Sequence, residues 1–193
     1  MKNLSKHFTA ITEQKHNTRP LLKGIHYNAA DNSMTVTDSH RLLQVKIGPV
    51  PATYTQDPTT LEFLEGTYPD VSRLVPQINE YQTIRPNTIE KTLLPMLKVL
   101  KEETILLSIK DKQVSILQEN NSKIGDFYLD GYPEDQIIAC NAKYLLQALA
   151  FVIDCDKFGL TREPVIFNYS TPVRPFLFST SCYTYLITPI RRS

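Results

Sequence analysis

An aspartate, a serine and a histidine stand side by side at Asp38, Ser39 and His40, and these are the residue types of a hydrolytic triad. They lie between two runs of alternating apolar and polar residues, 33–36 and 43–47, so we expect a tight corner between two strands. Neighbours on a strand point to opposite faces, whereas triad members come from distant parts of a chain. The corner therefore does not predict a serine hydrolase.

No other pattern indicates catalysis or metal binding. The sequence contains no P-loop, GxSxG or HExxH motif, and its four histidines and three cysteines show no metal-ligand spacing. Three widely spaced cysteines are typical of free thiols in a reducing compartment. No apolar run approaches the roughly 20 residues of a membrane span, and no signal peptide is evident at the start of the chain. We expect a cytoplasmic protein that is not an enzyme and has no cofactor or metal.

The chain has 193 residues and a formal charge of +1. Its apolar and polar residues predict a repeated pattern of one helix and three strands. The pattern recurs three times, at a period of roughly 50–60 residues. Each repeat is too small to bury its own sheet, so pairs of repeats should share a core in an α+β fold. The expected helices are 4–13, then one from an N-cap at 87 or 88 to about 101 with a kink or an early break at Pro95, and one after the N-cap Asn141. The expected strands are 21–27, 34–37, 42–47, 82–85, 104–109, 113–118, 126–129, 136–139, 165–169, 175–179 and 184–187, and the connector 48–66 is expected to hold a helical turn at 61–64.

Four segments resemble the bacterial DNA polymerase sliding clamp, the β subunit of DNA polymerase III. The segment T-D-S-H-R-L at 37–42 is similar to the T-D-G-H-R-L corner of that family. Residues 68–76 resemble the F-P-D-Y-R-R-V-x-P junction between the second and third clamp domains, and 141–149 resemble the last helix. Residues 172–178 with 185–191 resemble the closing strands and the Y-x-x-M-P-x-R tail. The resemblance implies a DNA-clamp fold, with about three repeated units here instead of six.

The resemblance also implies which parts of a clamp are present. Residues 1–67 resemble the first half of the middle domain with a connector, and 68–193 resemble a complete last domain. Full clamps have three domains, and two subunits close a ring around duplex DNA. A dimer of this chain would hold six units rather than twelve, so a closed ring would need more copies or another clamp.

In clamps, a pocket between the middle and last domains receives short linear motifs of DNA polymerases, clamp loaders and repair proteins. Leu42, Leu74 and Ile190 offer apolar surface for such a motif, while His40 and Arg73 offer polar groups. Two residues depart from the family pattern: Ser39 replaces a glycine where a positive φ is needed, and Thr188 replaces a methionine. The alternative is that these residues only pack two units together. The implied peptide-binding residues are Thr37, Ser39, His40, Arg41, Leu42, Pro69, Arg73, Leu74, Leu186, Ile187, Thr188, Pro189, Ile190 and Arg191.

Clamp helices also present basic residues to the phosphates of DNA without reading its bases. The candidates in this chain are Lys6, Lys15, Lys91, Lys98, Lys101 and Lys143, although lysines on exposed helix faces are commonly only solvated. The resemblance thus implies a clamp-like processivity or scaffold factor that forms homo-oligomers or pairs with another clamp. The alternative is a clamp mimic or regulator that binds proteins without encircling DNA.

Overall fold

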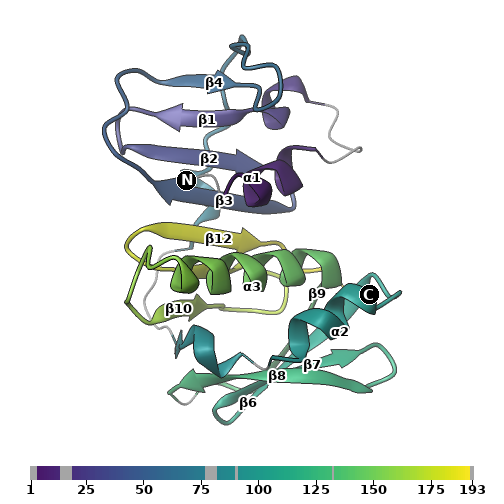
Figure 1. The fold of residues 1–193 in the computed structure, drawn as a ribbon. Helices are drawn as coiled ribbons and strands as arrows, with labels where there is room; N and C mark the ends of the chain where they lie inside the picture. Colours follow the sequence, from purple (N-terminus) through teal and green to yellow (C-terminus); the bar gives the residue numbers. More distant parts are fainter. Residues whose placement is uncertain (1–3, 14–18, 77–81, 90, 132, 192–193) are drawn as a thin grey trace. The chain divides into compact units, whose positions relative to one another are not determined.

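The structure is a computed structural model that describes residues 4–13, 19–76, 82–89, 91–131 and 133–191 (Figure 1). The chain divides into two compact units. The first contains the residues up to Val75 together with Ser181–Leu186, and the second contains Pro76–Thr180 together with the residues from Ile187 onward. No helix among the described residues is long and apolar enough to cross a membrane.

The first unit is an antiparallel sheet with one helix packed on it (Figure 1). Its strands run in the order β4-β1-β2-β3, and the amide of Lys46 on β3 donates to the carbonyl of Cys182 in the returning segment. Phe8 and Ile11 of the helix are buried together with Leu4, which directly precedes it, and this confirms the predicted apolar stripe. The elements are α1 Ser5–Thr12, the 3₁₀ turn η1 Pro20–Lys23, β1 Ile25–Asn28, β2 Ser33–Thr37, β3 Arg41–Lys46, β4 Tyr54–Gln56 and the 3₁₀ turn η2 Ser72–Leu74.

Two local predictions for this unit were wrong. The strand expected at 21–27 begins only at Ile25, because Pro20 starts the turn η1 with its fixed φ angle. The helical turn expected at 61–64 is absent from the described connector, which instead supplies strand β4 and an isolated bridge between Gln56 and Phe63. The side chain of Asp57 accepts hydrogen bonds from the amides of Thr59 and Thr60, and this Asx-type turn competes with a helix.

The second unit holds an antiparallel sheet in the strand order β11-β10-β5-β8-β7-β6-β9, with helices α2 and α3 beside each other (Figure 1). Its core contains Phe127, Phe167, Phe176 and Phe178, all fully buried with their rings in mutual contact. The elements of this half are β5 Gln82–Ile84, the 3₁₀ turn η3 Pro86–Thr88, α2 Leu93–Val99, β6 Thr104–Lys110, β7 Gln113–Gln118, β8 Lys123–Asp130, β9 Gln136–Asn141, α3 Ala142–Lys157, β10 Val165–Asn168 and β11 Phe176–Ser179, followed by β12 Tyr183–Ile187, most of which belongs to the first unit.

The two helices of this unit begin in different ways. Asn141 caps α3 as predicted, since its side-chain oxygen accepts hydrogen bonds from the amides of Lys143 and Tyr144. Helix α2 is shorter than predicted, because it begins at Leu93 and Pro95 therefore lies in its first turn, where proline is tolerated. The helix therefore shows neither the expected kink nor an early break at Pro95, but a late start.

The predicted repeat of one helix and three strands is confirmed. It appears as α1-β1-β2-β3, α2-β6-β7-β8 and α3-β10-β11-β12. The fold class is α+β with about three units, as the sequence predicted.

Candidate functional site

The corner between β2 and β3 is held by a single carboxylate. Asp38 accepts hydrogen bonds from the amides of His40 and Arg41 through Oδ1, at 3.0 and 2.8 Å. Its Oδ2 accepts from Nε and Nη2 of Arg41, at 3.0 and 2.8 Å. The hydroxyl of Thr37 closes the turn by donating to the carbonyl of Arg41 at 2.6 Å. The residues that looked like part of a triad therefore build a turn.

The side chain of Arg41 is buried and supports the fold of the first unit. Neither its guanidinium nor the Asp38 carboxylate is exposed, and Nη2 also donates to the carbonyl of Ala10 in α1 at 3.1 Å. A buried charge is tolerated when it is paired and fully hydrogen-bonded in this way. Arg41 thus links the corner to the helix, and its predicted contact with a peptide stays a prediction.

Two corner residues remain exposed at the surface, Ser39 and His40. Ser39 has φ +75°, in the left-handed region, which confirms that this position needs a positive φ. A residue with a Cβ pays roughly 1–2 kcal/mol for that conformation, which glycine would avoid. The hydrogen-bonded turn around Asp38 holds Ser39 in this conformation.

From here on the connector is taken to run from the end of β4 through the junction to residue 76, and it returns over one face of the sheet in the first unit. The Tyr68 ring stacks on the His26 ring, with centroids 4.4 Å apart and planes 5° from parallel. Burial raises the pKa of the Tyr68 hydroxyl, which approaches the main chain of Thr37 without forming a well-aligned hydrogen bond. Burial also lowers the pKa of His26, against a smaller opposite effect of the Asp31 carboxylate. No sequence pattern predicts this stack, because the two residues are far apart in the chain and belong to no motif.

A pocket of about 380 Å³ lies beside this stack, between the sheet and the connector. Thr35 and Gln44 line it from the sheet, and Pro69, Asp70 and Val71 line it from the connector. Farther along the connector, Arg73 and Leu74 are exposed, Leu74 by 47%. The first unit therefore brings the corner and the connector, two of the three predicted site segments, onto one sheet.

The third segment, the tail, lies mostly in the second unit. Leu186 and Ile187 are buried, and Thr188 and Pro189 are partly buried. Ile190 is 37% exposed, and its amide donates to the carbonyl of Ala139 on β9 at 2.8 Å. Arg191 is exposed. Strand β9 thus fixes the tail at Ile190, a role that the sequence did not reveal.

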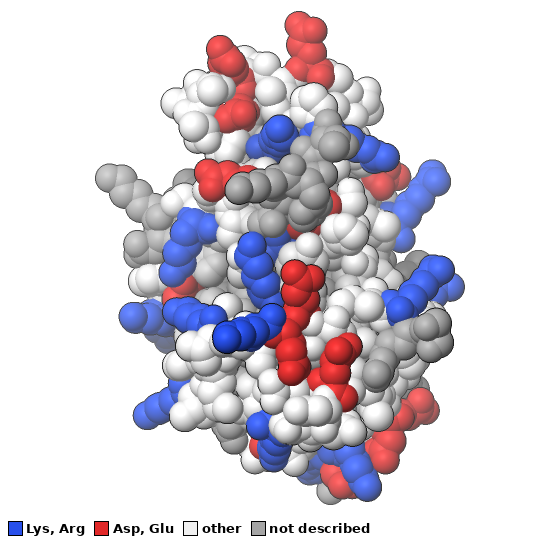
Figure 2. All heavy atoms as spheres, turned by 90° about the vertical axis from the view of Figure 1, so that its right-hand side faces the viewer, with Lys and Arg blue, Asp and Glu red and all other residues white. Residues whose placement is uncertain are grey.

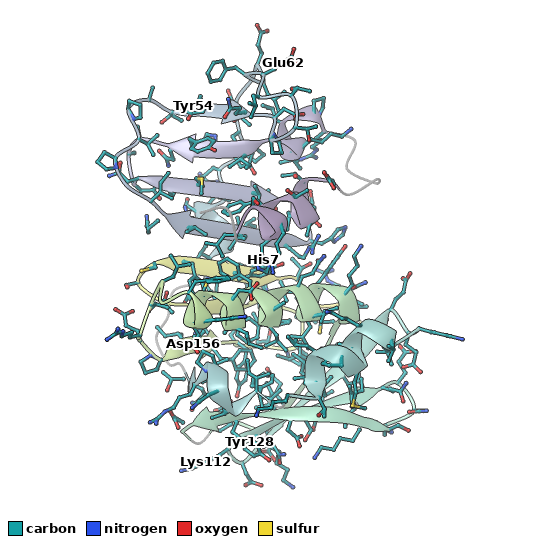
Figure 3. The ribbon with its side chains drawn as sticks, in the orientation of Figure 1. His7, Tyr54, Glu62, Lys112, Tyr128 and Asp156 are labelled. Atoms are coloured by element: carbon teal, nitrogen blue, oxygen red, sulfur yellow. The ribbon has the colours of Figure 1, made fainter. Side chains whose placement is uncertain are left out.

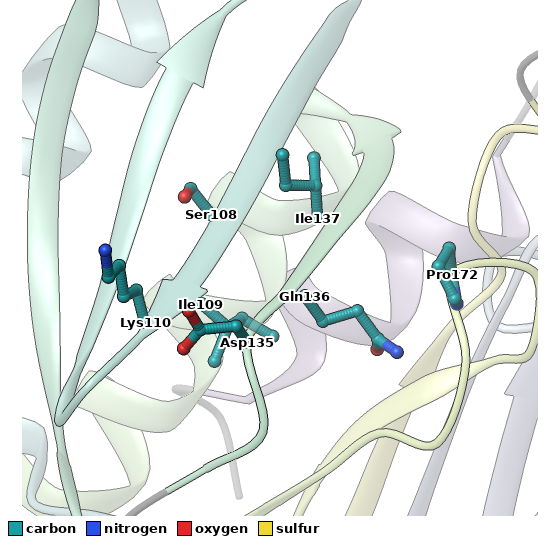
Figure 4. Close-up of a pocket in the computed structure, with 7 residues that line it drawn as sticks. All are labelled: Ser108, Ile109, Lys110, Asp135, Gln136, Ile137 and Pro172. Carbon is teal, nitrogen blue, oxygen red and sulfur yellow. The ribbon is translucent and has the colours of Figure 1, made fainter.

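A shallow hollow of about 650 Å³ lies near the same strand of the second unit (Figure 4). The side-chain nitrogen Nε2 of Gln136 donates to the Ser170 carbonyl at 3.4 Å, while the side-chain oxygen Oε1 is buried without a hydrogen-bond partner. Ile137 is 55% exposed there. No sequence motif marks this hollow, which is lined by Ser108, Ile109, Lys110, Asp135, Gln136, Ile137 and Pro172.

The described lysines proposed to contact DNA are all exposed, and Lys15 lies outside the described residues. Figure 2 shows basic and acidic side chains interspersed on the face it presents, so that face is not uniformly positive. Among the described residues, no group of three or more His, Cys, Asp or Glu side chains could hold a metal ion. The exposed candidates are Lys6, Lys91, Lys98, Lys101 and Lys143.

Comparisons with known proteins point to one family. No family model matches the chain. The beta sliding clamp of Streptococcus pneumoniae is 27% identical over 240 residues, which cover 95% of this chain and 60% of that clamp. The chain thus spans about 60% of the length of the curated relatives it matches. Because the aligned span is longer than the whole chain of 193 residues, the relatives carry additional residues inside the matched region.

Solved structures show the same fold. The DNA polymerase sliding clamp of Bacillus subtilis superposes with a TM-score of 0.74 at 21% identity, covering 100% of this chain and 62% of that clamp. The sliding clamp of Bartonella birtlesii bound to griselimycin gives 0.72 at 17% identity, covering 98% and 64%. The resemblance to bacterial sliding clamps and the predicted clamp fold are therefore confirmed, in a chain shorter than a full clamp.

The half-buried His26 should make the first unit sensitive to acid. Folding lowers the pKa of His26 below its ordinary value of 6.5, so the unfolded chain takes up a proton more readily. The His26 contribution to stability is therefore complete above that value and is lost as the pH falls through it. Denaturant unfolding between about pH 7.5 and pH 5.5 should show stability falling less steeply in His26→Gln than in the wild type. Equal pH dependence in the two proteins would contradict the assignment.

Proposed function

We propose that the chain is a sliding-clamp-like accessory factor of DNA replication that binds short linear motifs of other proteins. The corner, the connector and the tail would form the binding site. The observation that carries this proposal is the corner, where a clamp-like T-D-x-H-R-L sequence is folded around a buried ion pair and leaves Ser39 and His40 exposed. The likeness to sliding clamps over 95% of the chain supports it.

The predicted site residues fall into two groups by burial. Thr37, Arg41, Leu42, Leu186 and Ile187 are buried and would support the site. The remaining residues reach the surface and would contact the peptide: Ser39, His40, Pro69, Arg73, Leu74, Thr188, Pro189, Ile190 and Arg191. Leu74 and Ile190 would serve as apolar anchors, because large apolar contacts contribute most to such interfaces. His40 and Arg73 would orient the peptide by hydrogen bonds to its polar groups.

The partners would be DNA polymerases, clamp loaders or repair proteins that carry a clamp-binding motif. A solved relative, the clamp of Bartonella birtlesii, is bound to griselimycin, which supports a ligand site in this fold. In this reading residues 1–67 form half of a clamp domain with a connector, and residues 68–193 form a complete one. The protein would act in the cytoplasm as a binding factor, without a catalytic step of its own.

The exposed lysines on the helices would contact the phosphates of DNA, and this binding would not depend on the base sequence. The alternative, a clamp mimic or regulator that leaves DNA free, is favoured by the mixed charge of the face in Figure 2.

Substitution of either anchor should abolish peptide binding. Leu74→Asp and Ile190→Asp each place a charge where an apolar contact is proposed, so the dissociation constant for a Q-x-x-L-F-type peptide should rise roughly tenfold or more. Fluorescence anisotropy with a labelled peptide measures this effect. Val173→Asp is the matched control, because Val173 is 57% exposed and belongs to none of the three segments. Wild-type affinity in both anchor variants would discard the site.

A comparison of circular and linear DNA distinguishes a factor that encircles DNA from a regulator that leaves DNA free. A factor that encircles duplex DNA should be retained on a circular template and lost when that template is linearised. Direct phosphate contacts should also weaken steeply as salt is raised. Gel filtration of the protein with circular and linearised DNA measures retention. Equal behaviour on both templates, with peptide binding intact, would support the regulator reading instead.

A further inference from the structure

The connector is fastened to the first unit at two points (Figure 3). The first is next to β4, where the amide of Leu64 donates to the carbonyl of Thr55 at 2.9 Å. The second is Tyr68, which is 8% exposed and is the single buried residue among 56–76, all of which the structure describes. A segment that buries one side chain depends on that side chain for its place on the sheet. The course of the connector beyond Leu64 therefore depends on Tyr68.

Tyr68 lies on a row of side chains that crosses the sheet. His26 on β1 is paired with Thr55 on β4 and with Thr35 on β2, so these three side chains share one face. The ring of His26 is held by a hydrogen bond between its Nδ1 and Thr55 Oγ1 at 3.0 Å, and the Tyr68 ring stacks on it at 4.4 Å. The Tyr68 hydroxyl approaches the main chain of Thr37, at the corner end of β2. We call Tyr68 and His26 the stacked pair.

The segment that follows Tyr68 is locally stiff. The ring of Pro69 fixes its own φ angle. The Asp70 carboxylate accepts hydrogen bonds from the amide and the hydroxyl of Ser72, at 3.0 and 2.6 Å. The amide of Leu74 donates to the carbonyl of Val71 at 3.0 Å within η2. Because these local bonds keep the shape of residues 69–74, the position of Leu74 on the first unit follows the position of the stacked pair.

We propose that the stacked pair positions the peptide-contacting residues of the connector beside the corner. In this role Tyr68 and His26 do not touch the peptide, and they hold Arg73 and Leu74 where those residues meet it. A surface that is ordered before binding loses less conformational entropy when it binds. Release of the connector therefore weakens peptide affinity although every contact residue is still present. The inference rests on the proposed function and adds to it two residues that lie outside the predicted site.

Single substitutions separate the ring of Tyr68 from its hydroxyl. The hydroxyl oxygen is buried without a hydrogen-bond partner, so the ring supplies the stabilising contact. Tyr68→Ala and His26→Ala each remove one ring of the stacked pair, and each should raise the dissociation constant for a Q-x-x-L-F-type peptide roughly five- to tenfold. Tyr68→Phe keeps the ring and should bind like the wild type. Thr67→Ala is the matched control, because Thr67 is exposed and adjoins Tyr68.

Two further measurements distinguish positioning from a general loss of stability. The double variant Tyr68→Ala/His26→Ala should bind no more weakly than either single variant, because the same contact is lost only once. Amide spectra of the ¹⁵N-labelled chain without peptide should show the signals of Ser72 and Leu74 at disordered positions in both alanine variants. The signal of Leu43, in the middle of β3, should stay in place and show that the sheet is folded. If Tyr68→Ala does not fold, His26→Ala provides the test.

The possible failures can be told apart. A wild-type chain that does not bind the peptide discards the proposed function and this role of the stacked pair together. Wild-type binding with unchanged affinity in both alanine variants overturns the role of the stacked pair alone. Equal losses in Tyr68→Phe and Tyr68→Ala also overturn it, since the hydroxyl and not the stacked ring would then carry the effect. Signals of Ser72 and Leu74 that stay ordered in both alanine variants would show that the connector is held elsewhere.

Discussion

The first unit depends on the buried ion pair between Asp38 and Arg41. The Asp38 carboxylate accepts hydrogen bonds from two amides and from two nitrogens of Arg41, and Arg41 reaches the Ala10 carbonyl. One pair thus fixes the turn, the end of β2, the start of β3 and the position of α1. Removing one partner from such a pair leaves a buried charge uncompensated, which costs about 3–5 kcal/mol. The exposed residues Ser39 and His40 are held in place by this pair.

Much of the fold could be predicted because its signals are local. The spacing of Leu4, Phe8 and Ile11 predicted α1, and Asn141 as an N-cap residue predicted the start of α3. The late start of α2 could not be predicted from local signals. The helical spacing of apolar residues extends beyond the observed helix, and only the observed backbone places Pro95 in the first turn. Strand β4 was missed because three residues are too few for an alternating pattern, and its pairing partners lie far away in the sequence.

Less of the candidate site than of the fold could be predicted from the sequence. Residue types located the corner, but Arg41 and His40 are both polar, and the sequence does not say which one turns inward. The structure buries Arg41 against Asp38 and leaves His40 exposed. The stack of Tyr68 on His26 and the anchoring of Ile190 at Ala139 join residues that no motif connects. Such contacts are set by topology, so they become visible only once the strands are paired.

The central proposal is that one short peptide contacts the corner, the connector and the tail. Titration of the ¹⁵N-labelled chain with a Q-x-x-L-F-type peptide, followed by amide chemical shifts, tests it most directly. The account predicts that the amides of Ser39, Leu74 and Ile190 shift together and report one common affinity. Shifts confined to a single segment, or centred on the hollow around Ile137, would contradict it.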